Sequence, residues 1–351
     1  MPDDLFPWLS SKAAPRGGGF QVEPFTPAVG LANPHAQTLF AAAWKGQRGV
    51  SFQRTRIDTP DGDFIDMDLA VVAGVDLPPD APVALLLHGL EGSARRPYAL
   101  TMYRQLAQRG IRAAGMNYRS CSGEINRTAR SYHAGATDDV ALAHAWLDSR
   151  FPSVAKGMVG VSLGGNMLLK YLGERGGEMS IRLRAAVAIS PPFDLALDGE
   201  QLNQGLSQRY VAHFLASIQA KLRAKAELLR PLIDLERALA ARTLREIDEA
   251  MTAPLHGFAS AEDYYARASS RRYLAGIQVP TLILRAADDP LISSADIPHD
   301  LLQLNGALLG VITPQGGHVG WIEGRPLAWR FWAQRQAAVF LARYLHVKRD
   351  A

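Results

Sequence analysis

The hydrophobic positions from residue 83 onward fall into two alternating patterns. Continuous apolar runs predict strands buried on both faces, at residues 83–87, 111–117, 158–161, 185–189, 281–285 and 308–313. Apolar residues at helical spacing predict helices at residues 97–109, 138–149 and 165–172. Thr137-Asp138-Asp139 predicts the cap of the second of these helices. Because the two patterns alternate, the chain predicts an α/β fold with a mostly parallel central sheet and helices on both faces.

The segment before residue 83 follows a different pattern. Residues 52–57 and 64–72 flank the turn sequence Pro60-Asp61-Gly62-Asp63, which predicts an antiparallel hairpin. Residues 1–50 are rich in proline and glycine. We expect them to form an N-terminal extension that packs on the core, with one short helix near residues 36–44.

Residues 191–275 interrupt the alternation, because no strand pattern occurs in them. We expect a helical cap or lid inserted into a core made of residues 51–190 and 276–351. The apolar stripe of this cap is expected to pack on the core. A second interpretation adds a weak contact with a membrane surface through the cap. The stripe consists of residues at helical spacing, namely Tyr210, Val211, Phe214, Leu215, Ile218 and Leu222.

The composition is that of a globular protein with a substantial core: 351 residues, 48% hydrophobic and 21% charged. The net charge of +4 comes from scattered arginines without interleaved aromatics, so no nucleic acid is expected as a partner. The acidic, proline-broken start differs from a signal peptide, and no apolar run of about 18 residues occurs. The sequence therefore predicts a cytoplasmic protein. Cys121 is the single cysteine and is expected to pack as a small apolar residue.

The pentapeptide Gly160-Val161-Ser162-Leu163-Gly164 is the most informative motif of the chain. It matches G-x-S-x-G, with a strand pattern before it and a helix pattern after it. Glycine on both sides of the serine permits a turn too sharp for large side chains, which lifts the serine oxygen clear of the sheet. The motif in this context predicts that Ser162 is a nucleophile. An ordinary glycine-rich strand-to-helix connection is the alternative.

A serine nucleophile needs a general base, and the base needs an acid that orients it. In proteins that carry the serine on such a turn between a strand and a helix, the three residues follow along the chain in the order serine, acid, histidine. Asp288 and Asp289 follow the strand at 281–285, and we predict Asp289 as the acid with Asp288 as the alternative. A turn-forming role for this pair is the other interpretation. His318 follows two glycines after the last strand, which lets it reach back over the sheet edge, and it is the predicted base.

The oxyanion formed by serine attack has to be held by backbone N–H groups. We predict Leu163, the residue after the nucleophile, as one donor. The other is expected from the loop His88-Gly89-Leu90-Glu91-Gly92-Ser93, with Leu90 as the best candidate. His88 is expected to shape this loop and not to act as the base.

Other polar residues indicate what lines the pocket and whether a metal or a cofactor is expected. The segment Asn117–Glu124 follows a strand at the same sheet edge and either lines the pocket or forms a hydrogen-bonded scaffold. The nine histidines show no metal-binding spacing, and neither a Walker-type nor a dinucleotide-binding loop occurs. We therefore expect no metal and no cofactor.

Five segments in combination give the chain a specific family resemblance. The chain resembles the YheT-like branch of the α/β-hydrolase superfamily, which also contains eukaryotic ABHD-type hydrolases and yeast ester-forming enzymes. The resemblance implies an α/β-hydrolase fold, a triad of Ser162, Asp289 and His318, and activity on carboxylic esters. Members differ in substrate, from short and medium acyl esters to phospholipids. The segments that carry the resemblance are Asn33–Leu39, His88–Gly92, Arg119–Glu124, Gly160–Asn166 and Gly316–Gly320.

The sequence as a whole predicts a cofactor-independent serine esterase that acts on small esters with a hydrophobic acyl chain of short to medium length. The reaction is expected to proceed through an acyl-enzyme intermediate. An acyltransferase and a phospholipase would use the same triad and are the alternatives. A non-catalytic binding protein is the alternative from a different class. The natural ester and the oligomeric state are left open.

Overall fold

The computed structural model describes residues 19–44, 49–326 and 328–346. The strands of the central sheet are β1 (Val50–Asp58), β2 (Phe64–Val72), β3 (Val83–Leu87), β4 (Arg112–Asn117), β5 (Lys156–Val161), β6 (Leu183–Ile189), β7 (Thr281–Ala286) and β8 (Leu308–Thr313). A separate hairpin is formed by β9 (Ile322–Arg325) and β10 (Ala328–Phe331). The helices outside the insertion are α1 (Pro34–Ala43), α2 (Pro97–Ala107), α3 (Thr137–Arg150), α4 (Leu163–Arg175), η3 (Gly176–Glu178), η6 (Ser294–Asp296), α12 (His299–Leu304) and α13 (Trp332–Leu345).

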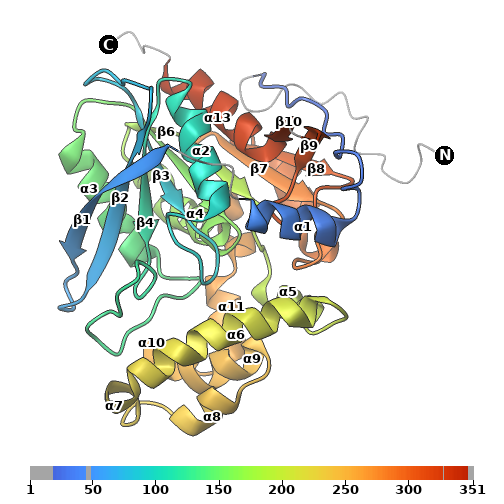
Figure 1. The fold of residues 1–351 in the computed structure, drawn as a ribbon. Helices are drawn as coiled ribbons and strands as arrows, with labels where there is room; N and C mark the ends of the chain where they lie inside the picture. The colour runs from blue at the N-terminus through green and yellow to red at the C-terminus, as the bar shows by residue number, and fades with distance from the viewer. Residues whose placement is uncertain (1–18, 45–48, 327, 347–351) are drawn as a thin grey trace.

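The central sheet has the strand order β1-β2-β4-β3-β5-β6-β7-β8 (Figure 1). Strands β3 to β8 pair in parallel, whereas β2 runs antiparallel to both of its neighbours. The predicted α/β class, the mostly parallel sheet and the hairpin around residues 60–63 are therefore confirmed. Each predicted strand lies within three residues of its observed ends, and β3, β5 and β7 are buried along their whole length, as their continuous apolar runs predict.

Two apolar cores lie on opposite faces of the sheet. Side chains alternate along a strand, so Leu85 and Leu87 of β3 face one core while Ala84 and Leu86 face the other. Helices α3 and α4 cover the first face, and α2 and α13 cover the second. The sheet thus has a helix layer on each side, as predicted.

The described part of the predicted N-terminal extension packs on the C-terminal part of the chain. The Phe20 ring meets Phe340 of α13 edge to face at 5.1 Å between centroids. The Gln37 side chain of α1 donates to the carbonyl of Ile322 at 3.1 Å and accepts from its N–H at 2.7 Å. The predicted extension before residue 19, and residues 45–48, lie outside the described residues.

Residues 190–280 are all described and contain helices but no strand. Helix α6 crosses below the sheet edge, with α7 and α8 beneath it and α11 above it, toward the core (Figure 1). Val211, Leu215 and Leu222 of α6 pack in a separate apolar cluster whose buried members all lie in the insertion, up to Met251. The prediction that the apolar stripe packs on the core is therefore wrong for these residues, because the shorter helices of the insertion cover them. The later part of the insertion, including Tyr264, packs instead in the core on the α4 face. The elements are α5 (Leu195–Leu202), α6 (Ser207–Ala224), α7 (Ala226–Leu229), α8 (Leu235–Ala240), α9 (Leu244–Ile247), the π-helical turn η4 (Asp248–Thr252), α10 (Ala253–His256), α11 (Ala261–Ala268) and η5 (Ser270–Gly276).

Two local features differ from the sequence predictions. Helix α3 begins at Thr137, and no side chain caps its first turn. The reason is that the N-cap position is Ala136, which has no polar side chain, while the Asp139 carboxylate binds the Arg119 guanidinium at 2.8 and 2.9 Å. The hairpin of β9 and β10 was not predicted, because its four-residue strands are too short to show a period of two.

Two helix glycines with opposite surroundings give a test of the packing. A Cβ atom at Gly173 of α4 would overlap the Tyr273 carbonyl group in η5, whereas one at Gly199 of α5 would meet no atom within 4 Å. We expect Gly173→Ala to lower the free energy of unfolding by about 2 kcal/mol through overpacking. Gly199→Ala should raise it by roughly 0.5 to 1 kcal/mol, since alanine favours a helix. Urea unfolding of both variants measures this, and a Gly173→Ala variant as stable as the parent would contradict the described contact.

Candidate active site

Ser162 stands at the sharp turn between β5 and α4. Its φ and ψ are 55° and −123°, which is a rare conformation for a residue with a side chain. A Cβ atom at Gly160 would overlap the Gly164 carbonyl, and one at Gly164 would overlap the carbonyls of Leu87, the last residue of β3, and of His88 after it. The two flanking glycines therefore allow α4 to start directly against the end of the sheet. This is the strand–turn–helix geometry that the G-x-S-x-G motif predicts.

The structure brings Ser162, His318 and Asp289 together into one hydrogen-bonded chain. The Oδ2 atom of Asp289 lies 2.8 Å from Nδ1 of His318, and Nε2 of His318 lies 2.9 Å from Oγ of Ser162. Because a carboxylate only accepts, the proton on His318 belongs on Nδ1. The Nε2 atom is then free to accept the serine proton, which is the arrangement that a general base requires.

The two neighbouring aspartates make different contacts. Asp288 accepts from the Gly317 backbone N–H at 2.9 Å and so supports the histidine loop from outside. Burial raises the pKa of Asp288. Burial also raises the pKa of Asp289, but its contacts with His318 and Arg285 lower it further, and the net shift is downward. Asp289 is thus the carboxylate that faces His318 and stays ionised there.

Arg285 holds Asp289 from the opposite side, and the sequence patterns had not marked it as a site residue. Its guanidinium is fully buried and lies 3.4 Å from Asp289 and 2.8 Å from Asp296. Asp289 also accepts from the backbone N–H of Leu291 at 2.9 Å. A charged residue within the apolar strand Thr281–Ala286 was the available signal, because such a charge is buried only when it is paired.

Helix α1 holds the histidine loop in place. The hydroxyl of Thr38 accepts from the backbone N–H of His318 at 2.9 Å. A Cβ atom at Gly317, which has a φ of +62°, would overlap the carbonyl of Pro34. The segment Asn33–Leu39, which carried part of the family resemblance, therefore shapes the turn that brings His318 over the sheet edge.

The predicted oxyanion donors lie on either side of the serine. Leu90 and Leu163 both line the same cavity as Ser162. Neither backbone N–H makes a hydrogen bond to another of the described residues; for Leu163 this is usual, because it is the first residue of α4, whereas Leu90 lies in the loop after β3. His88 is fully buried, and its Nδ1 donates to the Gly89 carbonyl at 2.8 Å. Burial lowers the pKa of His88 to about 3, so it is a neutral residue that shapes the loop.

The cavity in front of Ser162 and His318 extends into the helical insertion. Most of its wall is apolar, which suits the burial of a hydrocarbon chain. Its lining includes Leu202, Phe214, Ile218, Leu222, Ile247 and Met251.

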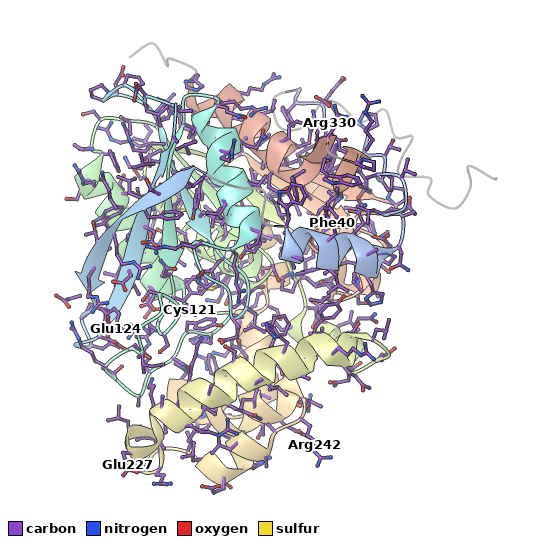
Figure 2. All side chains as sticks on the ribbon, in the orientation of Figure 1. Phe40, Cys121, Glu124, Glu227, Arg242 and Arg330 are labelled. Carbon is purple, nitrogen blue, oxygen red and sulfur yellow. The ribbon has the colours of Figure 1, made fainter. Side chains whose placement is uncertain are left out.

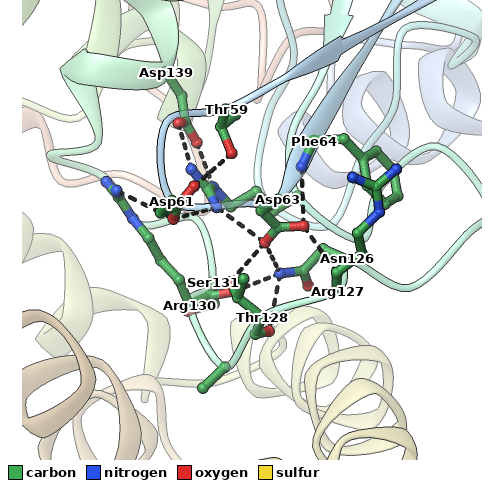
Figure 3. Close-up of polar contacts among 12 residues, drawn as sticks. Thr59, Asp61, Asp63, Phe64, Asn126, Arg127, Thr128, Arg130, Ser131 and Asp139 are labelled. Atoms are coloured by element: carbon green, nitrogen blue, oxygen red, sulfur yellow. Dashed lines mark hydrogen bonds and ion pairs between the residues drawn. The ribbon is translucent and has the colours of Figure 1, made fainter.

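The loop after β4 forms a polar part of the cavity wall. Arg119 lines the cavity, and its side chain is 1% exposed. It donates to Asp61 at 2.8 Å and to Asp63 at 2.9 Å, besides its two contacts with Asp139. Asn126 joins the loop to Asp63, as Figure 3 shows. The segment Asn117–Glu124 and the residues that follow it thus both line the pocket and act as a hydrogen-bonded scaffold.

Two further findings concern the described residues only. They contain no group of three or more histidine, cysteine, aspartate or glutamate side chains that could hold a metal ion. None of the helices formed by these residues is both long and apolar enough to cross a membrane.

The comparisons with known proteins agree with this geometry. The family model described as the alpha/beta hydrolase fold matches residues 82–325. YheT of Escherichia coli (strain K12), a proposed esterase, is 36% identical over 92% of this chain and 94% of its own. Phospholipase ABHD3 of Mus musculus is 30% identical over 86% of this chain and 74% of its own.

A solved structure shows the same fold at low sequence identity. The esterase Pf2001 of Pyrococcus furiosus superposes with a TM-score of 0.52 and 14% identity, covering 93% of this chain and 98% of its own. The chain therefore belongs to the α/β-hydrolase family and, within it, to the branch that includes YheT and ABHD3. It is an enzyme of the carboxylic ester hydrolase class, of the esterase and lipase type, as predicted.

Asp248 in the cavity wall gives a testable pH dependence. Its carboxylate accepts from Thr252 at 2.7 Å and from Tyr265 at 2.9 Å, and burial raises its pKa to about 6. The unfolded chain has a value of about 3.9. The folded state therefore binds the proton more tightly, and its contribution to stability is present below pH about 4 and lost as the pH rises to about 6.

We expect Asp248→Asn to remove this loss. Relative to the variant, the parent protein should lose roughly 2 kcal/mol of unfolding free energy between pH 4 and 6.5, from 1.36 kcal/mol for each pKa unit and an unfolded carboxylate that is already about half ionised at pH 4. Urea unfolding curves over this pH range measure the difference. A constant difference between the two proteins across the range would contradict the assignment.

Proposed function

We propose that this enzyme hydrolyses carboxylic esters with Ser162 as nucleophile. Ser162 attacks the ester carbonyl while His318 accepts its proton, and Asp289 orients the imidazole and stabilises its charged form. The backbone N–H groups of Leu90 and Leu163 hold the oxyanion. The protonated His318 then gives its proton to the leaving alcohol, which leaves an acyl group on Ser162. A water molecule, deprotonated by His318, releases the acid.

One observation carries this proposal. The Ser162 oxygen is hydrogen-bonded to a histidine of defined tautomer, and this oxygen faces a largely apolar cavity. A nucleophile, its base and a site for the acyl group are then found in one place, which is the constellation that acyl transfer requires. The backbone N–H groups of Leu90 and Leu163 make no hydrogen bond to another described residue, so both are available to stabilise the oxyanion in this proposal.

The substrate follows from the cavity. We propose that residues 191–275 act as a cap and that a hydrophobic acyl chain of short to medium length lies among Phe214, Ile218, Leu222 and Met251. ABHD3 is named as a phospholipase and a yeast relative as a monoacylglycerol lipase, and both names describe esters of fatty acids. The polar wall around Arg119 suits the alcohol portion of such an ester.

Ser162→Ala tests the nucleophile. Without the hydroxyl no acyl-enzyme forms, so kcat for p-nitrophenyl octanoate should fall by at least about 10⁴-fold. Covalent labelling of the parent enzyme, but not of the variant, by a fluorophosphonate provides the independent readout. A variant that hydrolyses the ester at the parent rate would rule out the mechanism.

A matched pair of variants tests the acid. Asp289→Asn should lower kcat by about 10⁴-fold, because an amide can donate to His318 and so stabilise the wrong tautomer. Asp288→Asn keeps an oxygen for the Gly317 N–H, so it should stay within about tenfold of the parent. Steady-state kinetics of the two variants decide between the residues, and the reverse ranking would make Asp288 the acid.

A further inference from the structure

Helix α6 is joined to the loops that carry the proposed acid, the proposed base and the proposed oxyanion donor Leu90. At its first residue, the Ser207 hydroxyl donates to the carbonyl of Pro290, which follows Asp289. One turn later, Tyr210 contacts His35 of α1 at 3.1 Å, and α1 holds the His318 loop through Thr38. These contacts join the insertion to the acid loop and, through α1, to the histidine loop.

The second half of α6 grips the oxyanion loop through Glu91. Lys221 pairs with the Glu91 carboxylate at 2.7 Å, and the hydroxyl of Ser217, one turn earlier on the same helix face, donates to it as well. Lys221 also approaches Cys121 at 3.4 Å, and Figure 2 shows Cys121 on the core side, facing α6. The ion pair therefore bridges the insertion and the core, with the Glu91 side chain only 3% exposed.

On the core side of the junction, the N–H, the carbonyl and one carboxylate oxygen of Glu91 are also hydrogen-bonded. Tyr132 donates its hydroxyl to the carboxylate at 2.7 Å and accepts from the Glu91 N–H at 2.8 Å. Arg96 donates to the Glu91 carbonyl at 2.8 Å. The φ of Glu91 is +52°, a left-handed conformation that costs free energy for a residue with a side chain and persists only where the surroundings enforce it.

Leu90, the proposed oxyanion donor, directly precedes this strained and fully bonded residue. The same helix that holds Glu91 also lines the acyl cavity with Phe214, Ile218 and Leu222. A hydrocarbon chain that packs on these residues would stabilise α6 in the position from which Lys221 and Ser217 hold Glu91. The chain-binding wall and the oxyanion loop are thus coupled through one helix.

We propose that Glu91 is a positioning residue through which cap helix α6 sets the oxyanion donor Leu90, so that occupancy of the acyl cavity raises the rate of the chemical step. This inference rests on the proposed serine mechanism. It assigns the Glu91–Lys221 pair a role in kcat, whereas a pair that only joined two parts of the fold would affect stability alone. Longer acyl chains are then favoured in kcat as well as in KM.

The test compares kcat and KM for p-nitrophenyl acetate and octanoate in Glu91→Gln, Lys221→Met and the double variant. Gln keeps the size of Glu91 and one accepting oxygen, but it removes the charge and replaces the other accepting oxygen with an NH2 group that cannot accept from Lys221. We expect kcat for octanoate to fall by about tenfold to a hundredfold in each, less than the loss of a whole oxyanion donor, with KM within about threefold. The ratio of the octanoate to the acetate kcat should fall toward one.

The double variant should be no slower than the slower single variant, because both changes break one contact.

Two further measurements separate positioning from stability. Inhibition by octyl trifluoromethyl ketone, whose adduct with Ser162 carries the oxyanion, should weaken in parallel with kcat. Arg230→Met breaks the exposed Arg230–Glu227 pair of the same insertion and is expected to leave both kcat values unchanged. Where Glu91→Gln does not yield folded protein, Ser217→Ala and Lys221→Met apply the same test from the cap side.

The outcomes distinguish this inference from the proposed function. An octanoate kcat within twofold of the parent in Glu91→Gln and Lys221→Met, or single losses that multiply in the double variant, would overturn the coupling. Ser162→Ala would still be inactive in that case, and the serine mechanism would stand. Full activity of Ser162→Ala would overturn both.

Discussion

The close approach of α4 to the end of β3 is the constraint on which the rest of the site depends. Gly160 and Gly164 remove the atoms that would keep the helix away from the sheet, and Ser162 takes a strained conformation between them. The start of α4 then presents the Leu163 N–H beside the loop that follows β3, which carries Leu90. One steric requirement therefore places the proposed nucleophile beside both proposed oxyanion donors.

The partners of the serine depend on groups outside the sheet core. His318 is held by Thr38 of α1, and Asp289 is held by Arg285 and the Leu291 N–H. Such supports restrict the side chains to the geometry that proton transfer needs, which is worth more than their modest contribution to stability. The N-terminal segment is thus part of the site although it lies more than 270 residues from His318 in sequence, a separation of 280 for Thr38.

The sequence was informative where a local pattern determines the structure. Buried parallel strands appear as continuous apolar runs, and the strand–turn–helix motif identifies Ser162 because its glycines answer a local steric need. The choice of Asp289 over Asp288 also agrees with the contacts, but adjacent residues cannot be separated by spacing alone. A charge within an apolar strand was the only signal for Arg285, and the roles of Glu91 and Lys221 could not be predicted, because these two residues pair across 130 positions. Long-range ion pairs leave no periodic signal in one sequence.

The ionic contacts near the site share one property, since each buried charge has its partner on a different structural element. Arg285 on β7 meets Asp296 in η6, Glu91 in the oxyanion loop meets Lys221 on α6, and Arg119 after β4 meets Asp139 on α3. Separating such a pair would leave a charge buried without compensation, which costs several kcal/mol. The pairs therefore fix the relative positions of the elements more strongly than apolar contacts, which tolerate sliding. This effect matters most at the junction of the core and the insertion. The apolar cluster of the core is separate from that of the insertion, and the Glu91–Lys221 pair connects the two parts.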